Sequence, residues 1–148
     1  MTASKARLQL CTCLLVANLA FIWGNSLLPG ALSQLLSDWG RSVLGMTPSG
    51  TSAGPDLLRK AAHFLEFACL GALLSWRMGM LGKRHRLAFP PAVAAAVLDE
   101  TIQIFSPERG PGLKDVALDS CGAAVGILFV WIGYTYWKHT KHLEETNT

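Results

Sequence analysis

Four long apolar stretches dominate the chain, and polar or charged positions separate them. They run from about 8 to 23, 57 to 76, 87 to 105 and 117 to 137. Each approaches the roughly 20 apolar residues that a helix needs to cross a hydrocarbon core about 30 Å thick. The pattern therefore predicts an all-α protein, a polytopic membrane bundle of four transmembrane helices that forms a single domain over residues 1–148.

The first stretch is short and follows Lys5 and Arg7, which is also the pattern of a secretory signal peptide. The segment Asn18-Leu19-Ala20 is a poor cleavage site, because a polar residue occupies the third position back and residues 21–23 continue the apolar run. We therefore expect the first helix to remain uncleaved.

Another pattern lies between the first two stretches, where apolar side chains recur at helical spacing and polar ones fill the other face. The apolar positions are Leu32, Leu35, Leu36, Trp39, Val43 and Leu44. They predict a short amphipathic helix, either on the outer membrane surface or packed on the ends of the other helices.

Composition agrees with residence in a membrane. Hydrophobic residues make up 51% of the chain and charged residues 16%, against about 25% charged residues in a typical soluble domain. Mean hydropathy is +0.32. The net charge of +3 comes from basic residues that are scattered along the chain, so a nucleic-acid-binding face is not expected.

The basic residues also predict the orientation, because Lys and Arg in short loops stay on the cytoplasmic side. With the amino terminus inside, more of the 13 basic residues fall on the inner side than on the outer side. The run Lys83-Arg84-His85-Arg86 carries most of this bias. Both termini are therefore expected in the cytoplasm.

Ionisable residues interrupt the outer halves of the predicted spans, where charge is costly unless it is paired or hydrated. His63 and Glu66 are three residues apart and share a helix face. With a rise of about 1.5 Å per residue, they reach the same depth as Asp99, Glu100 and Gln103 of the third span. We therefore expect these residues to line one outward-facing site.

Two more acids extend this pattern. Asp115 and Asp119 are one helical turn apart at the start of the fourth span, also on the outer side. Asp99 and Glu100 are adjacent, so their directions on a helix diverge by about 100°. One of these two acids is expected to point to the site and the other to a neighbouring helix, with Glu100 narrowly favoured for the site.

Small residues spaced four apart occur in three of the spans and allow close packing of membrane helices. The pairs are Gly122 with Gly126, Ala68 with Ala72, and Ala92 with Ala96. They favour a compact bundle, in which the polar residues of different helices come within reach of one another.

Three polar motifs follow one another along the chain. They are Lys60-x-Ala62-His63-Phe64-x-Glu66-Phe67, then Asp99-Glu100-x-x-Gln103-x-Phe105-x-Pro107-x-Arg109, then Asp115-Val116 with Asp119-x-x-Gly122 and Gly126. A fourth and weaker motif, Asn25-Ser26-x-x-Pro29-Gly30, precedes them. In these motifs and their order, from about residue 21 to 126, the chain resembles the VanZ-like membrane proteins.

This resemblance implies a small multi-pass protein of the bacterial cytoplasmic (inner) membrane. Some members of that family are linked to reduced susceptibility to teicoplanin and related lipid-bearing glycopeptides. The resemblance implies no catalytic assignment. Two positions depart from the family pattern: Asp119 stands where an Asn is usual, and Glu108 stands where a Gly usually precedes the arginine, Arg109.

The favoured function is binding or modulation of a cell-envelope lipid or glycolipid, with Arg109 and Lys114 as contacts for an anionic group. The predicted ligand-binding residues are Lys60, His63, Glu66, Asp99, Glu100, Gln103, Arg109, Asp115 and Asp119. Membrane lipids are the other expected partners, and a homodimer is left open.

Two alternatives stay open. In one, the protein is a membrane-embedded enzyme that acts on an envelope lipid at the outer leaflet, with His63 or Glu66 as general base and Asp99 or Glu100 as ligand of a divalent metal. No motif specific to a reaction supports it, and no cofactor beyond this candidate metal is predicted. In the other, the polar residues only tie the helices together.

Overall fold

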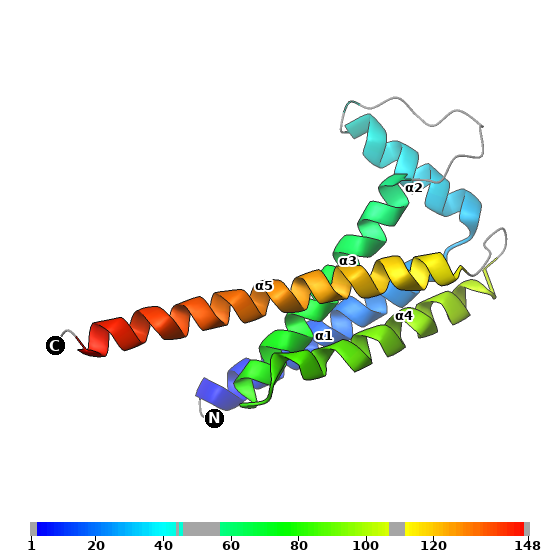
Figure 1. The fold of residues 1–148 in the computed structure, drawn as a ribbon. Helices are drawn as coiled ribbons and strands as arrows, with labels where there is room; N and C mark the ends of the chain where they lie inside the picture. The colour runs from blue at the N-terminus through cyan, green and yellow to red at the C-terminus, as the bar shows by residue number, and fades with distance from the viewer. Residues whose placement is uncertain (1–2, 44, 46–56, 107–111, 147–148) are drawn as a thin grey trace.

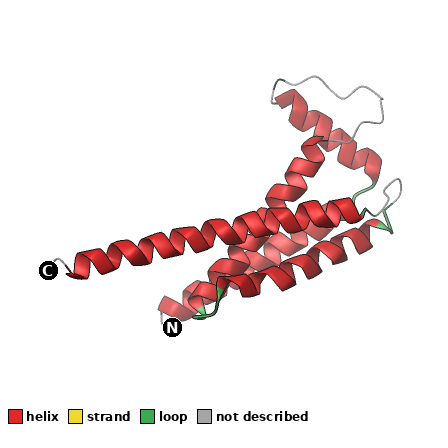
Figure 2. Cartoon of the chain, in the orientation of Figure 1, coloured by secondary structure: helices red, strands yellow, loops and turns green. Residues whose placement is uncertain are grey.

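The structure, a computed structural model, describes residues 3–43, 45, 57–106 and 112–146. The described residues form helices and turns and contain no strand, which confirms the all-α prediction (Figures 1 and 2). The elements are α1 (Ala3–Ser26), α2 (Gly30–Val43), α3 (Leu57–Met80), the 3-10 helix η1 (His85–Ala88), α4 (Phe89–Gln103) and α5 (Leu113–Thr146).

Among the described residues, two helices are long and apolar enough to cross a membrane. These segments are Ser4–Ser26 of α1 and Leu113–Lys141 of α5. Both extend beyond the predicted spans 8–23 and 117–137. By length and composition, the structure thus supports membrane residence for the first and last of the four predicted spans.

The predicted span 87–105 is only partly α-helical. Helix α4 has 15 residues, a rise of about 22 Å, which is less than a hydrocarbon core of about 30 Å. It begins late because η1 precedes it and prolines occupy its first turn. It ends early because the backbone N–H groups of residues 104–106 bond to carbonyls three residues back, which forms a turn.

Helices α1, α3, α4 and α5 run side by side, and both chain termini lie at the same end of the bundle (Figure 1). The most extensive contact joins α3 to α5. A Cβ atom added at Gly122 or Gly126 would collide with a backbone carbonyl of α3, and one added at Gly71 would collide with the carbonyl of Ala123. Close approach of these two backbones therefore depends on glycine, as the Gly122 and Gly126 pair predicts.

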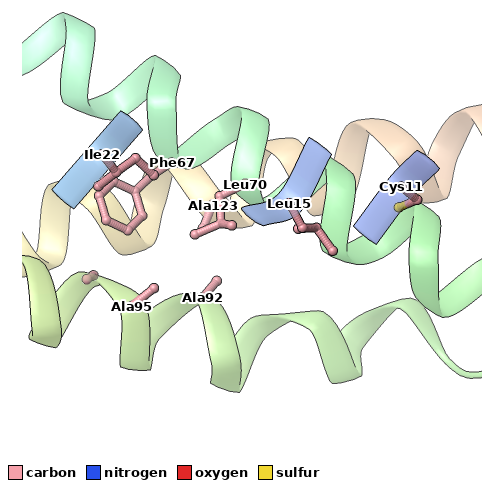
Figure 3. Packing of buried hydrophobic residues seen from close by; sticks show 9 residues of the cluster. Cys11, Leu15, Ile22, Phe67, Leu70, Ala92, Ala95 and Ala123 are labelled. Carbon is pink, nitrogen blue, oxygen red and sulfur yellow. The ribbon is translucent and has the colours of Figure 1, made fainter. Parts of the chain in front are cut away.

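The apolar core is narrow and rich in small residues (Figure 3). Ala92 and Ala95 of α4 point toward the side chains that α1 and α3 contribute, with Phe67 as the largest. Many large apolar side chains instead face outward: Leu10, Val16, Phe21, Val97, Leu98, Leu128 and Phe129 are all exposed. Such an apolar exterior is suited to hydrocarbon rather than to water.

The helix predicted between the first two spans is present as α2, which lies at the end of the bundle away from the termini (Figure 1). It contacts α3, and a Cβ atom added at Gly40 would lie 3.5 Å from Leu58 Cδ2. Leu35 and Trp39 are 66% and 69% exposed, and Leu32 and Val43 are exposed as well. The described part of the apolar stripe is therefore not packed against the other helices.

Candidate functional site

Polar side chains gather at the end of the bundle away from the termini, where α1 and α4 end and α3 and α5 begin. Each of α3, α4 and α5 contributes residues that the sequence predicts for the site. We call the following set the polar cluster: Lys60, His63, Glu66, Asp99, Glu100, Gln103, Asp115 and Asp119.

Helix α4 contributes three buried members of the polar cluster. Asp99 and Gln103 lie one turn apart, and Gln103 Nε2 donates a hydrogen bond of 2.8 Å to Asp99 Oδ2. Glu100 points in another direction, and its Oε2 accepts a hydrogen bond of 2.7 Å from the backbone N–H of Gly112. The two adjacent acids thus diverge but both stay inside the protein, Asp99 toward α3 and Glu100 toward the segment that enters α5.

Helix α3 places His63 between two carboxylates. Its Nδ1 lies 3.7 Å from Glu66 Oε2 and 3.9 Å from Asp99 Oδ2. Glu66 in turn accepts a hydrogen bond of 3.0 Å from Asn25 Nδ2 of α1. The depth comparison made from the sequence expects these residues at one level, and the structure brings them within reach of one another.

Helix α5 places one acid inside the polar cluster and another at its edge. Asp119 is only 2% exposed, and it brings a carboxylate oxygen within 4.8 Å of donor atoms of His63 and Asp99. Asp115 pairs with Lys60 at 3.5 Å, and these two side chains are 32% and 37% exposed. The polar cluster therefore has a buried interior and a partly open edge.

Hydrogen bonds also tie α1 to α4 beside the polar cluster. Ser106 Oγ donates to the backbone carbonyl of Ser26 at 2.7 Å, and Gln103 Nε2 lies 3.5 Å from Ser26 Oγ. Asn25, Ser26 and Ser106 are absent from the residues predicted for the site. The only sequence signal for them is the weak Asn25-Ser26 motif and the position of Ser106 just before Pro107.

Several buried carboxylate oxygens of the polar cluster accept no hydrogen bond. Within the described chain, Asp99 Oδ1, Glu100 Oε1 and Asp119 Oδ1 have no hydrogen-bond partner. A buried polar atom without a partner is uncommon in native proteins and points to a missing proton, water or ion. The interior of the polar cluster therefore has unused capacity to hold a positively charged or hydrogen-bonding group.

A small cavity reaches into the polar cluster. Its lining residues are Arg59, Lys60, His63, Glu100, Gln103, Asp115, Leu118 and Asp119. The space that the centre of a water molecule can occupy is about 10 Å³, which is close to the minimum for a single water. In this conformation the interior therefore admits an occupant the size of a water molecule or an ion, whereas larger groups reach only the edge.

The candidate metal ligands can now be compared with the expectation from sequence. His63, Asp99 and Asp119 form a group of nitrogen and oxygen donors of the kind that holds a divalent metal. Of the two acids expected as ligands, Asp99 belongs to this group and Glu100 does not. Arg109, predicted as an anion contact, lies outside the described residues. Lys114, the other predicted anion contact, is exposed and is not among the residues that line the cavity.

A sequence model of the family described as VanZ/LLP1 matches residues 9–134. This range contains every residue of the polar cluster, as well as Asn25, Ser26 and Ser106. No curated protein and no solved structure matches the chain.

Proposed function

The chain belongs to the VanZ/LLP1 family, and we propose that it is a multi-pass membrane protein whose polar cluster binds the polar headgroup of a cell-envelope lipid or glycolipid. The observation that carries this proposal is the convergence of the polar cluster at one end of an otherwise apolar bundle. Ionisable residues inside membrane helices are costly and usually serve a function.

We propose that four helices, α1, α3, α4 and α5, cross the membrane together. The apolar exterior supports this arrangement, because exposed Leu, Val and Phe side chains occur on α1, α4 and α5 alike. Helix α4 is short, but η1 and the turn at residues 104–106 extend its path along the bundle. The close packing of α3 against α5 supports the placement of α3 beside a helix that can span a membrane by itself.

The proposed orientation places the polar cluster at the outer leaflet of a bacterial cytoplasmic membrane. Lys83, Arg84 and Arg86 are exposed at the opposite end of the bundle, where both termini also lie. Basic residues of short loops stay in the cytoplasm. The end with the termini is therefore cytoplasmic, and the polar cluster faces the outside, where envelope lipids and glycopeptide antibiotics meet.

The chemistry of the edge fits a headgroup that carries both anionic and hydroxyl groups. Arg59 and Lys60 line the mouth of the cavity and supply cationic donors for phosphate. Asp115, beside Lys60, supplies a carboxylate acceptor for hydroxyl groups. Because the interior has room only for a water-sized occupant, we propose that the headgroup binds across this edge.

A structural role for part of the site is favoured by its hydrogen bonds. Gln103 bonds to Asp99 in its own helix and approaches Ser26 of α1, while Ser106 bonds to the Ser26 backbone. These contacts join helices, and neither Ser26 nor Ser106 is among the residues that line the cavity. We therefore assign Ser26 and Ser106 to helix association, and Lys60 with Asp115 to ligand contact.

The proposal is tested with purified protein in detergent and labelled envelope lipids. Lys60→Ala removes a cation at the cavity mouth, and Lys114→Ala, an exposed lysine outside the cavity lining, is the matched control. We expect Lys60→Ala to weaken lipid binding at least tenfold and Lys114→Ala to change it less than threefold, as monitored by native mass spectrometry. Equal affinities for all three proteins would contradict the proposed site.

Incubation of the same lipids with the wild-type protein separates binding from catalysis. Binding alone predicts that the labelled lipid is recovered unchanged after prolonged incubation, with and without a chelator. A new product that forms with the wild-type protein and is absent without protein would establish the enzymatic alternative instead.

A further inference from the structure

Three side chains from three different helices direct donor atoms at one point inside the polar cluster. His63 comes from α3, Asp99 from α4 and Asp119 from α5, and one donor atom of each lies within 4.8 Å of the others. Residues far apart in the sequence thus converge on one small volume. Convergence of this kind differs from a run of acids along a single helix, because it depends on the packing of the whole bundle.

The two aspartates are fully enclosed yet incompletely bonded. Asp99 is 0% and Asp119 is 2% exposed. Within the described residues, Oδ1 of each aspartate has no hydrogen-bond partner. The cavity beside Asp119 has room for one water-sized occupant, so a single bound water or ion is sufficient to satisfy these atoms.

Acidic side chains outnumber basic ones around this point, where Arg59 and Lys60 also line the cavity. Glu66 lies beside His63, and Glu100 lines the same cavity as Asp119. Among the described residues, Lys60 is paired with Asp115 at the edge rather than with the buried aspartates. Buried charges without a partner are strongly destabilising, and a bound cation stabilises several carboxylates at once.

We propose that His63, Asp99 and Asp119 bind one divalent transition-metal cation, Zn²⁺ or Mn²⁺. One imidazole and two carboxylates form a donor set that suits these ions, whereas Mg²⁺ and Ca²⁺ prefer oxygen donors alone. The cavity beside the three residues has room for a water-sized occupant, which can complete the coordination. This site goes beyond the proposed headgroup binding and does not depend on it.

Neighbouring residues support the three ligands in the way that metal sites usually require. Gln103 Nε2 holds Asp99 Oδ2 at 2.8 Å, which fixes the carboxylate, while Oδ1 has no hydrogen-bond partner among the described residues. Glu66 Oε2 lies 3.7 Å from the His63 ring, and Asn25 holds the other oxygen of Glu66. Because Glu66 lies beside Nδ1, it orients the ring and raises its basicity when Nε2 is the atom that binds the metal.

The three donor atoms lie slightly farther apart than the ligand atoms of a site that holds a metal ion. Metal bonds of about 2.1 Å keep two ligand atoms roughly 3.0 to 4.2 Å apart. The donor atoms here lie within 4.8 Å of one another. Closure by on the order of 1 Å is therefore sufficient.

The test measures metal binding by the full chain in detergent, in the absence of any lipid. Protein freed of metal by a chelator is titrated with Co²⁺, whose visible absorption reports on the ligands around it, and then with Zn²⁺, which displaces Co²⁺. We expect one cation per chain, with Zn²⁺ and Mn²⁺ bound at least tenfold more tightly than Mg²⁺. Absence of stoichiometric binding would overturn the proposal.

Variants distinguish a defined site from a general attraction of cations to acids. Asp119→Asn and Asp99→Asn keep the shape of the side chain and remove a ligand charge, and each should weaken Co²⁺ binding at least tenfold. Glu100→Gln is the matched control, because Glu100 is a buried acid of the same cavity outside the ligand group. It should change the affinity less than threefold, and an equal loss with Glu100→Gln would overturn the assignment of ligands.

Thermal stability gives a second readout. Metal bound only to the folded state raises the unfolding temperature, so we expect Zn²⁺ to raise that of the wild type but not that of Asp119→Asn. A Zn²⁺-dependent rise of equal size in both proteins would contradict the proposal. Since lipid is absent throughout, failure of this test leaves headgroup binding unaffected, and failure of the lipid test leaves the metal site unaffected.

Discussion

Asp99 on α4 lies 3.9 Å from His63 on α3, measured from Oδ2 to Nδ1, and the same oxygen accepts a hydrogen bond from Gln103. One carboxylate thereby joins two helices and depends on a neighbour in its own helix for its orientation. Gln103 also approaches Ser26 of α1 at 3.5 Å. A single buried amide thus connects the polar cluster to the helix ends that surround it.

Replacing Gln103 with Met is expected to destabilise the bundle. The thioether has similar length but cannot donate to Asp99 or Ser26, so a buried carboxylate oxygen loses its partner. We expect the free energy of unfolding to fall by about 1–3 kcal/mol, seen as a lower midpoint of thermal unfolding followed by circular dichroism in detergent.

Thr101→Ala is the control for this change. Thr101 is exposed, and its hydroxyl donates only to the Val97 carbonyl of its own helix. We expect a change within about 0.5 kcal/mol. Equal destabilisation by the two substitutions would show that the position in α4, rather than the buried amide, decides stability.

Glycine at position 126 is expected to be essential for the contact of α3 with α5. A methyl group there would meet the Ala68 carbonyl, so Gly126→Ala should force the helices apart and lower the free energy of unfolding by about 1–3 kcal/mol. Gly133 lies in the same helix with open space around its Cα among the described residues. Gly133→Ala should therefore be neutral or stabilising by up to about 1 kcal/mol, so that only Gly126→Ala lowers the unfolding midpoint.

The sequence is sufficient to predict the all-helical fold class and the depth along the helices at which the ionisable residues meet, because both depend on local pattern. It does not predict the η1 segment and the turn that shorten α4. His63 and Asp99 are recognisable as partners by depth alone, since charge inside a membrane helix needs compensation. Gly126 is recognisable from its spacing to Gly122. Each of these features depends on the residue spacing within one helix or on the distance of a residue from a helix end. Both quantities can be read from the sequence.

Other contacts of the site could not be predicted, because they depend on how the helices rotate against one another. Ser26 and Ser106 are small polar residues at helix ends, where hydropathy and charge give no sign of burial. Gly71 has no glycine four residues away, yet it is as close to the neighbouring backbone as Gly126. The choice of Asp99 rather than Glu100 as the neighbour of His63 likewise depends on helix rotation, which the divergence of about 100° between adjacent residues leaves open.

Loss of charge in the polar cluster is expected to impair the proposed function more than stability. Glu66→Gln keeps an oxygen acceptor for Asn25, and it removes a negative charge from a partly buried position. In a host whose teicoplanin susceptibility depends on this protein, we expect the variant to reach wild-type levels in the membrane and to lose most of the effect on susceptibility. An unchanged susceptibility with normal membrane levels would favour a purely structural role for Glu66.

The orientation of the bundle is expected to depend on the basic residues before α4. Lys83, Arg84 and Arg86 are exposed at the end that holds both termini, and basic residues near the ends of spans stay in the cytoplasm. A reporter that is active only outside the cytoplasm, fused after Thr148, should be silent in the wild type.

Reversal of the three charges to Glu should make insertion heterogeneous, so that a fraction of the fusions becomes active. Exchange of each Lys for Arg and each Arg for Lys keeps the charge and should leave the reporter silent. An active reporter in the wild type would place the polar cluster on the cytoplasmic side, and the headgroup it meets would then belong to the inner leaflet.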